Sequence, residues 1–160
     1  MSWSRRAALV ALAGAVAACG FTPVRGPGGA ADGLVGLIDV APPDDPVGFA
    51  LVRALEDRVG TGDAPLWELS ADIFLRSEAI GVTADQVVTR NTILARAPWR
   101  LTDGAGTVVT SGEAEGFTGY STTSTSIATL AARRDAEERL MRALADQIVA
   151  ELLATAGTWR

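Results

Sequence analysis

The sequence predicts an α+β fold, a two-layer sandwich with two helices packed on one face of a four-stranded, mostly antiparallel sheet. Three observations support this prediction. Apolar residues recur at helical spacing in two segments, and they alternate with polar residues in the segments between. Turns rich in glycine or proline separate the segments. The expected order of elements along the chain is β-α-β-β-β-α.

The first strand and the first helix are expected near the start of this domain. Residues 34–40 form a short aliphatic run, which predicts a strand. Asp44 and Asp45 then precede Pro46, an arrangement typical of a capping carboxylate followed by proline in the first helical turn. A helix over about 46–59 is therefore expected, and the glycine that follows should end it. Its apolar residues have helical spacing: Val47, Leu51, Val52, Leu55 and Val59.

Three strands are expected next. From Leu66 to Arg76 apolar and polar residues alternate, which predicts one half-buried strand. A turn around 81–85 leads to a long strand over about 86–101. The residues Asp103-Gly104-Ala105-Gly106 are typical of a hairpin turn, and a return strand over about 107–120 follows. Residues 80–120 are thus expected to form an antiparallel meander.

A long helix is expected at the end of the chain. The polar run 121–126 is interpreted as a loop, and the helix covers about 127–155. Pairs of opposite charge four residues apart, Asp135 with Arg139 and Glu138 with Arg142, favour a helix. Residues 157–160 are expected to be a C-terminal tail. The apolar stripe of this helix has a spacing of four: Leu140, Leu144, Ile148 and Leu152.

The N-terminus has the features of a bacterial lipoprotein signal. Arg5 and Arg6 form a positive start, and the apolar run 7–18 is too short to cross a bilayer as a helix. Small residues directly precede Cys19, the single cysteine of the chain, which is the lipobox pattern. We therefore expect residues 1–18 to be a signal peptide, with Cys19 carrying diacylglycerol on its sulfur and an acyl chain on its amino group. The alternatives are an ordinary signal peptide and a buried core cysteine.

Such an anchor would place the protein on a membrane surface. Burying each CH₂ contributes about 0.8 kcal/mol, and two or more acyl chains give stable anchoring where one is marginal. Gly20 rather than aspartate follows the cysteine, which favours the periplasmic side of the outer membrane. Residues 19–33 are expected to be a flexible lipid tether, and residues 34–156 the folded domain.

Composition excludes several classes of function. The chain has 14 basic residues, all arginine, and 19 acidic ones, so its net charge is −5. An acidic domain is a poor match for nucleic acid, whose phosphates require a basic surface. Because the chain has no histidine and no lysine, it cannot form a Ser-His-Asp triad, a histidine metal site or a Schiff base. We expect neither an enzyme nor a bound cofactor other than the covalent lipid.

Several short motifs resemble the LptE family of lipopolysaccharide-assembly lipoproteins, particularly its alphaproteobacterial members. The similarity lies in the order of the elements behind the lipobox and in four segments, none of which is catalytic. They are Cys-Gly-Phe-Thr-Pro at 19–23, Val-Ala-Pro-Pro at 40–43, Gly-Phe-Thr-Gly-Tyr at 116–120 and Ala-Ala-Arg-Arg-Asp-Ala-Glu at 131–137.

The resemblance implies an outer-membrane protein that plugs the LptD β-barrel, assists its folding and helps lipopolysaccharide pass to the cell surface. It implies no catalysed reaction. In the family, lipid binding is ascribed to basic residues towards one end of the sheet, but the turn at 81–85 contains no cation here. The alternative is an auxiliary lipoprotein of another envelope transporter, which binds a different ligand or partner.

Candidate contact residues follow from the expected strands. Arg90, Arg96 and Arg100 are evenly spaced on one strand and could share a face, where guanidinium groups would suit the phosphates of lipopolysaccharide. The alternative is a solvated or barrel-contacting face. Phe117 and Tyr120 are candidates for contact with the barrel wall, or else pack into the core. Glu113 and Glu115 share a face as well, and we interpret them as solubilising residues rather than a catalytic pair.

Overall fold

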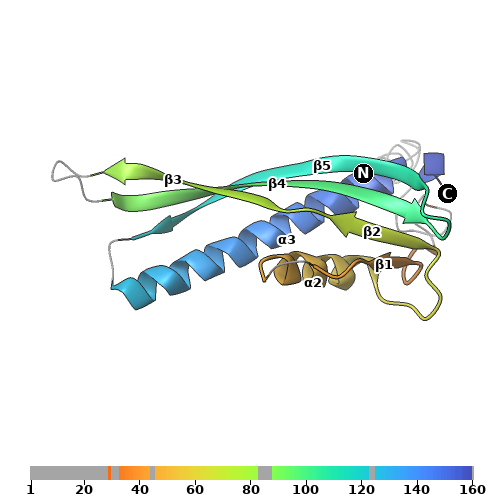
Figure 1. The fold of residues 1–160 in the computed structure, drawn as a ribbon, viewed down its shortest axis with the longest axis horizontal. Helices are drawn as coiled ribbons and strands as arrows, with labels where there is room; N and C mark the ends of the chain where they lie inside the picture. The colour runs from red at the N-terminus through yellow and green to blue at the C-terminus, as the bar shows by residue number, and fades with distance from the viewer. Residues whose placement is uncertain (1–28, 30–32, 44–45, 83–87, 123–124, 160) are drawn as a thin grey trace, which may run out of the picture.

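The computed structural model describes residues 29, 33–43, 46–82, 88–122 and 125–159. The elements follow in the order β1 (Ile38–Val40), α2 (Gly48–Val59), β2 (Trp67–Ala71), β3 (Phe74–Val82), β4 (Val88–Asp103), β5 (Val108–Ser121) and α3 (Ser126–Trp159). Both helices lie on the same face of the sheet, with α3 running along most of its length (Figure 1). The predicted α+β sandwich is therefore confirmed.

The sheet is built around the long strand β4. On one side, β4 pairs antiparallel with β2 through residues 99–103 and with β3 through residues 88–96. On its other side it pairs antiparallel with β5 over most of its length. The short strand β1 pairs with β2, and this is the one parallel pairing among the described strands. The described sheet thus has five strands where the sequence predicted four.

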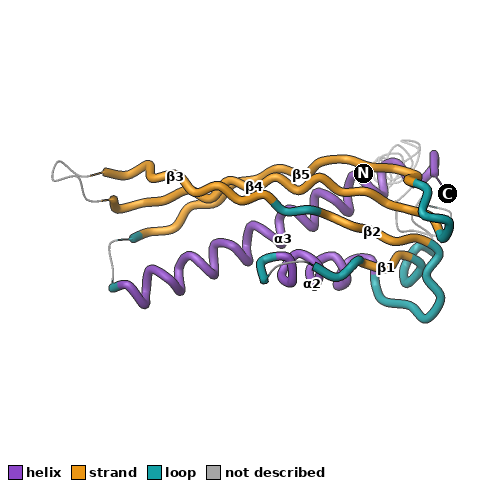
Figure 2. Tube along the Cα trace, in the orientation of Figure 1, coloured by secondary structure: helices purple, strands orange, loops and turns teal. Residues whose placement is uncertain are grey.

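The additional strand results from Pro98 in β4. The expected strand from Leu66 to Arg76 is divided between Ala71 and Phe74 into β2 and β3 (Figure 2), yet its register against β4 is the same on both sides of the division. Opposite the division, the N–H of Asp72 donates to the carbonyl oxygen of Pro98 at 3.0 Å. Proline has no N–H to donate in return, so the ladder lacks one bond there.

The first strand is shorter than predicted because of Gly36. The strand was expected over residues 34–40, but β1 begins at Ile38. Gly36 has a positive φ of 77°, a conformation that favours glycine, and its N–H donates to the carbonyl oxygen of Val59 at 3.0 Å. The residues before β1 therefore form a turn against the end of α2.

The core lies between the helices and the inner face of the sheet. The stripe predicted for the last helix is confirmed, because all four of its members are buried. They pack in one cluster with the inward residues of β4 and with Leu51 and Leu55 of α2. The inward residues of β4 alternate along the strand: Ile93, Ala95, Ala97, Trp99 and Leu101.

The helix α3 extends further than predicted, through residues expected to form a tail. Near its end the rings of Trp159 and Trp67 meet edge to face, with centroids 5.3 Å apart. The hydroxyl of Thr158 donates to the carbonyl oxygen of Thr155 at 2.7 Å. These contacts continue the helix to Trp159. The predicted ion pair of Asp135 with Arg139 is confirmed on its exposed side.

The predicted hairpin turn after β4 is also confirmed. The N–H groups of Ala105 and Thr107 donate to Oδ1 of Asp103 at 2.9 and 2.8 Å, and Gly106 has a φ of 80°. The signal peptide, Cys19, most of the tether, Asp44, Asp45 and most of the turn at 81–85 lie outside the described residues. The helix α2 begins at Gly48 with Val47 as its N-cap, so Pro46 precedes the first helical turn in which it was predicted. Neither described helix combines the length and the apolar character needed to cross a bilayer.

Candidate partner-binding surface

The two faces of the sheet differ in what covers them. The helices cover the inner face, while no described element covers the outer one (Figure 1). The side chains of Arg90, Arg96 and Arg100 are exposed, and their even spacing along β4 places them all on this outer face. The predicted sharing of one face is therefore confirmed.

Arg96 is held by two carboxylates of the neighbouring strand β5. Its Nη2 donates to Oε2 of Glu113 at 2.7 Å and its Nε to Oε1 at 3.2 Å. Oε1 of Glu115 lies 3.5 Å from the same Nε. The hydrogen bond from Arg96 lowers the pKa of Glu113 below its ordinary value, and the bond to Glu113 raises the pKa of Arg96. The two glutamates share a face as predicted, and here they neutralise an arginine.

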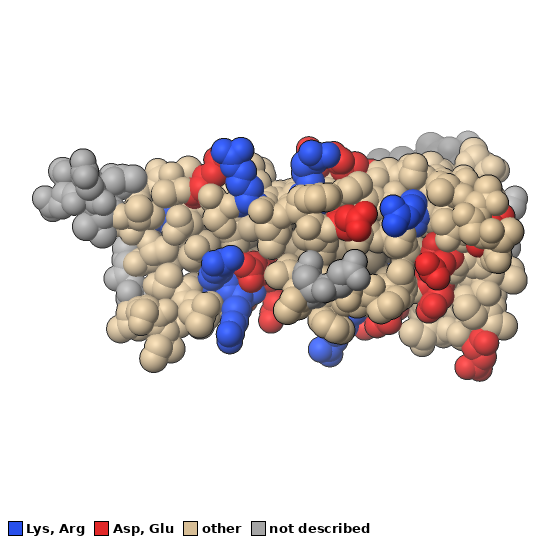
Figure 3. Space-filling view, in the orientation of Figure 1, with Lys and Arg blue, Asp and Glu red and all other residues tan. Residues whose placement is uncertain are grey.

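The other two arginines do not converge on Arg96. A rise of about 3.3 Å per residue puts Arg100 roughly 13 Å and Arg90 roughly 20 Å from it along the strand. Nη1 of Arg100 lies 3.8 Å from Oδ2 of Asp72, whereas Arg90 forms no ion pair with a residue that the structure describes. Basic and acidic side chains lie beside one another across the face drawn in Figure 3. Among the described residues, the outer face therefore carries separate ion pairs and the isolated Arg90, and no cluster of arginines.

An apolar patch interrupts these ion pairs on the outer face. We define the outer apolar patch as Phe74 of β3, Leu94 of β4 and Phe117 of β5, all of which are exposed. Leu94 on β4 lies directly opposite Phe117 on β5. Phe74 on β3 lies opposite Arg96, which is two residues after Leu94 on β4. The three side chains line an open trough of about 440 Å³ that Arg76 and Arg96 flank. Exposed apolar patches of this kind often mark binding surfaces.

Phe117 and Tyr120 lie on opposite faces of the sheet. Phe117 is 77% exposed at the outer apolar patch, while Tyr120 is half-buried and packs against the core. Their separation by three residues explains this, because strand residues an odd number apart point to opposite faces. The structure therefore brings Phe117 together with Phe74 and Leu94 instead of with Tyr120.

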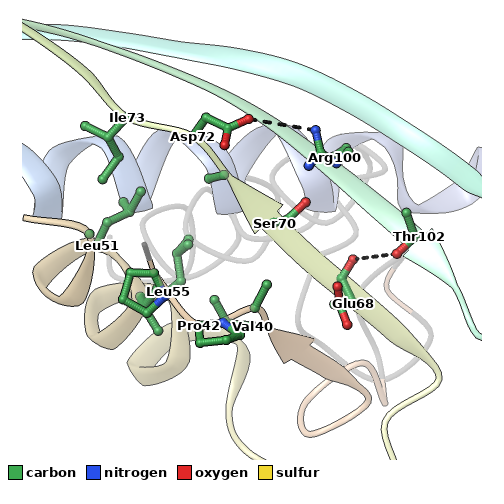
Figure 4. Close-up of a pocket in the computed structure, with 15 residues that line it drawn as sticks. Val40, Pro42, Leu51, Leu55, Glu68, Ser70, Asp72, Ile73, Arg100 and Thr102 are labelled. Atoms are coloured by element: carbon green, nitrogen blue, oxygen red, sulfur yellow. Dashed lines mark hydrogen bonds and ion pairs between the residues drawn. The ribbon is translucent and has the colours of Figure 1, made fainter. Parts of the chain in front are cut away.

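A smaller cavity lies at the free end of β1. It has a volume of about 270 Å³ and is lined by residues of β1, α2, β2 and β4. Asp72 and Arg100 meet at its rim, and Leu51 and Leu55 form its apolar side (Figure 4). The cavity exists because β1 ends at Val40, so the neighbouring part of β2 has no described strand beside it. Among its described lining residues Arg100 is the one cation, and that cation lies beside the carboxylate of Asp72.

Comparison with known families decides the family of this chain. The family model of LptE, described as lipopolysaccharide-assembly, matches residues 36–152. The chain belongs to the LptE family. Its matched region covers every described strand, all of α2 and most of α3. Among curated proteins, none matches the chain.

Solved structures share the LptE-family fold described above. A protein from Caulobacter crescentus described as a lipoprotein is 24% identical, with a TM-score of 0.64, covering 76% of this chain and 91% of that one. The rare lipoprotein B of Shewanella oneidensis is 10% identical, with a TM-score of 0.56 and coverage of 74% and 92%. A minor lipoprotein of Acinetobacter baumannii is 12% identical, with a TM-score of 0.56 and coverage of 76% and 94%.

Sequence reasoning missed two of the three residues of the outer apolar patch in this LptE-family chain. From Trp67 to Leu75 the other apolar residues are all at odd positions, so the even position of Phe74 was the available signal that it faces outward. Leu94 likewise lies between outward-facing polar residues of β4. Their meeting with Phe117 depends on strand register, which the sequence does not display.

Proposed function

We propose that this LptE-family protein is an outer-membrane lipoprotein that binds the LptD β-barrel and assists its assembly during lipopolysaccharide transport. The observation that carries the proposal is the uncovered outer face of the sheet with its outer apolar patch. Aromatic residues supply much of the binding energy at protein interfaces, and Phe74 and Phe117 are both exposed there. The proposal includes no catalysed reaction.

The proposed anchor is the lipid on Cys19. The lipobox supports it, and the mature chain would begin at that residue. Acyl chains on the sulfur and on the amino group would hold the protein at the periplasmic side of the outer membrane. The folded domain would then meet the barrel from that side, through the sheet face that its own helices leave open.

Direct contact with lipopolysaccharide would involve Arg90 before the other candidate arginines. Arg96 and Arg100 already lie beside carboxylates, and a phosphate would have to displace those partners. We expect Arg90→Glu to weaken binding of lipopolysaccharide to the purified protein at low salt, and Arg90→Glu with Arg96→Glu to weaken it further. Unchanged binding by the double variant would remove both arginines from the site.

Co-purification tests the partnership with the barrel. The tagged full-length chain, extracted from outer membrane in detergent, should bring down LptD in equal amount. Phe117→Asp should reduce this yield severalfold, because it places a charge within the outer apolar patch. Phe49→Asp is the matched control, since Phe49 is a similarly exposed phenylalanine on α2, away from the outer face. Recovery of a different envelope protein in place of LptD would contradict the proposal and support the auxiliary-lipoprotein alternative.

A further inference from the structure

We propose that β3 is a self-pairing edge, through which two copies of this chain join their sheets in antiparallel orientation when the protein is free of its barrel partner. The strand β3 (Phe74–Val82) lies at the edge of the sheet, and β4 is its one partner among the described strands. An exposed strand edge presents N–H and C=O groups ready to pair with another strand. The proposal commits to a second copy because the edge is complementary to itself.

The backbone of β3 points its free groups outward at alternate residues. Asp72 donates toward β4, so even-numbered residues in the same register direct their N–H and C=O groups to β4. The odd-numbered residues Leu75, Ser77 and Ala79 therefore present theirs at the open edge. Beyond them, the register shifts at a bulge after Ala79. The regular part of the edge is centred on Ser77.

The side chains complement one another about Ser77. In an antiparallel pair with Ser77 opposite Ser77 of the second copy, Arg76 lies opposite Glu78 and Leu75 opposite Ala79. Arg76 and Glu78 share the outer face, where they already form an ion pair of 3.0 Å within one chain. In the dimer each arginine would lie next to a glutamate of its own chain and of the second copy. Opposite charges directly across a strand pair are stabilising, and like charges are destabilising.

The surroundings of β3 leave room for a second copy. Every described side chain of β3 from Phe74 to Ile80 is exposed, on both faces of the sheet. The helix α2 contacts β1 and α3, and α3 contacts β5 and β4, so neither covers β3. In Figure 1, β3 extends beyond the end of α2. Pairing would protect an otherwise open and partly apolar edge from uncontrolled association.

Disulfide trapping tests the pairing directly. In antiparallel strands a hydrogen-bonded pair has Cα atoms about 5.5 Å apart, within the range that a disulfide spans. The full-length chain with Ser77→Cys, purified in detergent without other membrane proteins, should form a covalent dimer on mild oxidation. Ser111→Cys, an exposed serine on the other edge strand β5, is the matched control and reports any background from Cys19. Dimer formation no greater than in this control would overturn the proposal.

Charge reversal supplies an independent test. Arg76→Glu would set glutamates opposite one another at two symmetric positions, and we expect the dissociation constant of the dimer to rise about tenfold. Arg76→Glu combined with Glu78→Arg restores opposite pairs, so its dissociation constant should return to within about twofold of the unmodified chain. Arg133→Glu removes an exposed ion pair on α3, away from β3, and should leave the dissociation constant of the dimer unchanged. Sedimentation equilibrium measures the dissociation constant of each variant. Equal dissociation constants for all three variants would overturn self-pairing through β3.

Discussion

Trp99 on β4 lies directly against Gly112 on β5, and the indole ring occupies the space where a side chain at Gly112 would begin. A Cβ atom at that glycine would be 2.7 Å from Cζ2 of Trp99. Trp99 is 4% exposed, and its indole N–H donates to Oε2 of Glu151 on α3 at 3.2 Å. The glycine thus lets a large aromatic residue connect the sheet to the long helix.

The first prediction concerns this contact. Gly112→Ala should lower the free energy of unfolding by about 1–3 kcal/mol, because Trp99 must move from a closely packed position. Gly119→Ala is the matched control on the same strand, since its Cβ would have only an ordinary contact with a backbone oxygen. Chemical denaturation of both variants measures the difference. An equal loss in the two variants would show that strand propensity, and not the Trp99 contact, sets the cost.

The second prediction concerns the packing of α3. Ile148 is completely buried, so Ile148→Ala should lower the free energy of unfolding by about 2–5 kcal/mol through lost burial and a residual cavity. Ile127→Ala on the same helix removes a side chain that is 81% exposed, and it should change the free energy of unfolding by no more than about 0.5 kcal/mol. Similar values for both would mean that α3 does not pack on the sheet as described.

The third prediction concerns the pH dependence of an ion pair between the helices. Nε of Arg58 on α2 donates to Oδ1 of Asp146 on α3 at 2.6 Å, which lowers the pKa of Asp146 below its ordinary value of 3.8. Because the pKa of Asp146 is lower in the folded state, its ionised carboxylate stabilises the fold at any pH above the pKa of the unfolded state. This stabilisation is lost as the pH falls through the pKa of the folded state. Because the Asp146 side chain is 70% exposed, solvent screening limits the contribution to about 0.5 kcal/mol.

Asp146→Asn should therefore be less stable than the unmodified chain at neutral pH. This difference in stability should vanish at a pH below the folded-state pKa of Asp146. Thermal unfolding over an acid titration measures this difference. Asp135→Asn, which breaks an exposed pair within α3 alone, serves as the control for losing one carboxylate. A difference that stayed constant across the titration would show that the carboxylate charge is not its source.

The fourth prediction concerns the missing hydrogen bond opposite Asp72. Pro98→Ala supplies an N–H that can donate to the carbonyl oxygen of Asp72, so β2 and β3 should become one continuous strand. The new bond is worth about 0.5–1.5 kcal/mol, while loss of proline rigidity in the unfolded chain offsets about 0.4–1 kcal/mol of this. Stability should change little, but hydrogen exchange should show a protected amide at residue 98. Rapid exchange of that amide would contradict the account of the division.

Patterns within one segment predicted most of the elements correctly. The spacing of four in α3 needs no information from elsewhere in the chain, and its four members are buried as predicted. The turn at Asp103 is similarly local, because the aspartate accepts hydrogen bonds from residues two and four positions ahead. Such features depend on residues that are close in sequence, so a single sequence reveals them.

Features that depend on pairing between strands were not predictable in the same way. The division of the strand at Asp72 depends on Pro98 in a different strand, whose position opposite it follows only from register. The face of the three candidate arginines was predicted from their spacing, but the carboxylates beside Arg96 come from β5. The outer apolar patch likewise takes one residue from each of three strands.

The fifth prediction concerns the uncovered sheet face, which we propose is the surface that meets the barrel. A photo-reactive amino acid at Phe117 in the full-length chain should, on irradiation of intact cells, form a covalent adduct with LptD. The same group at Phe49 on α2 should form much less of that adduct, because Phe49 lies away from the outer face. Adducts with LptD from Phe49 but not from Phe117, or from neither position, would contradict the claim.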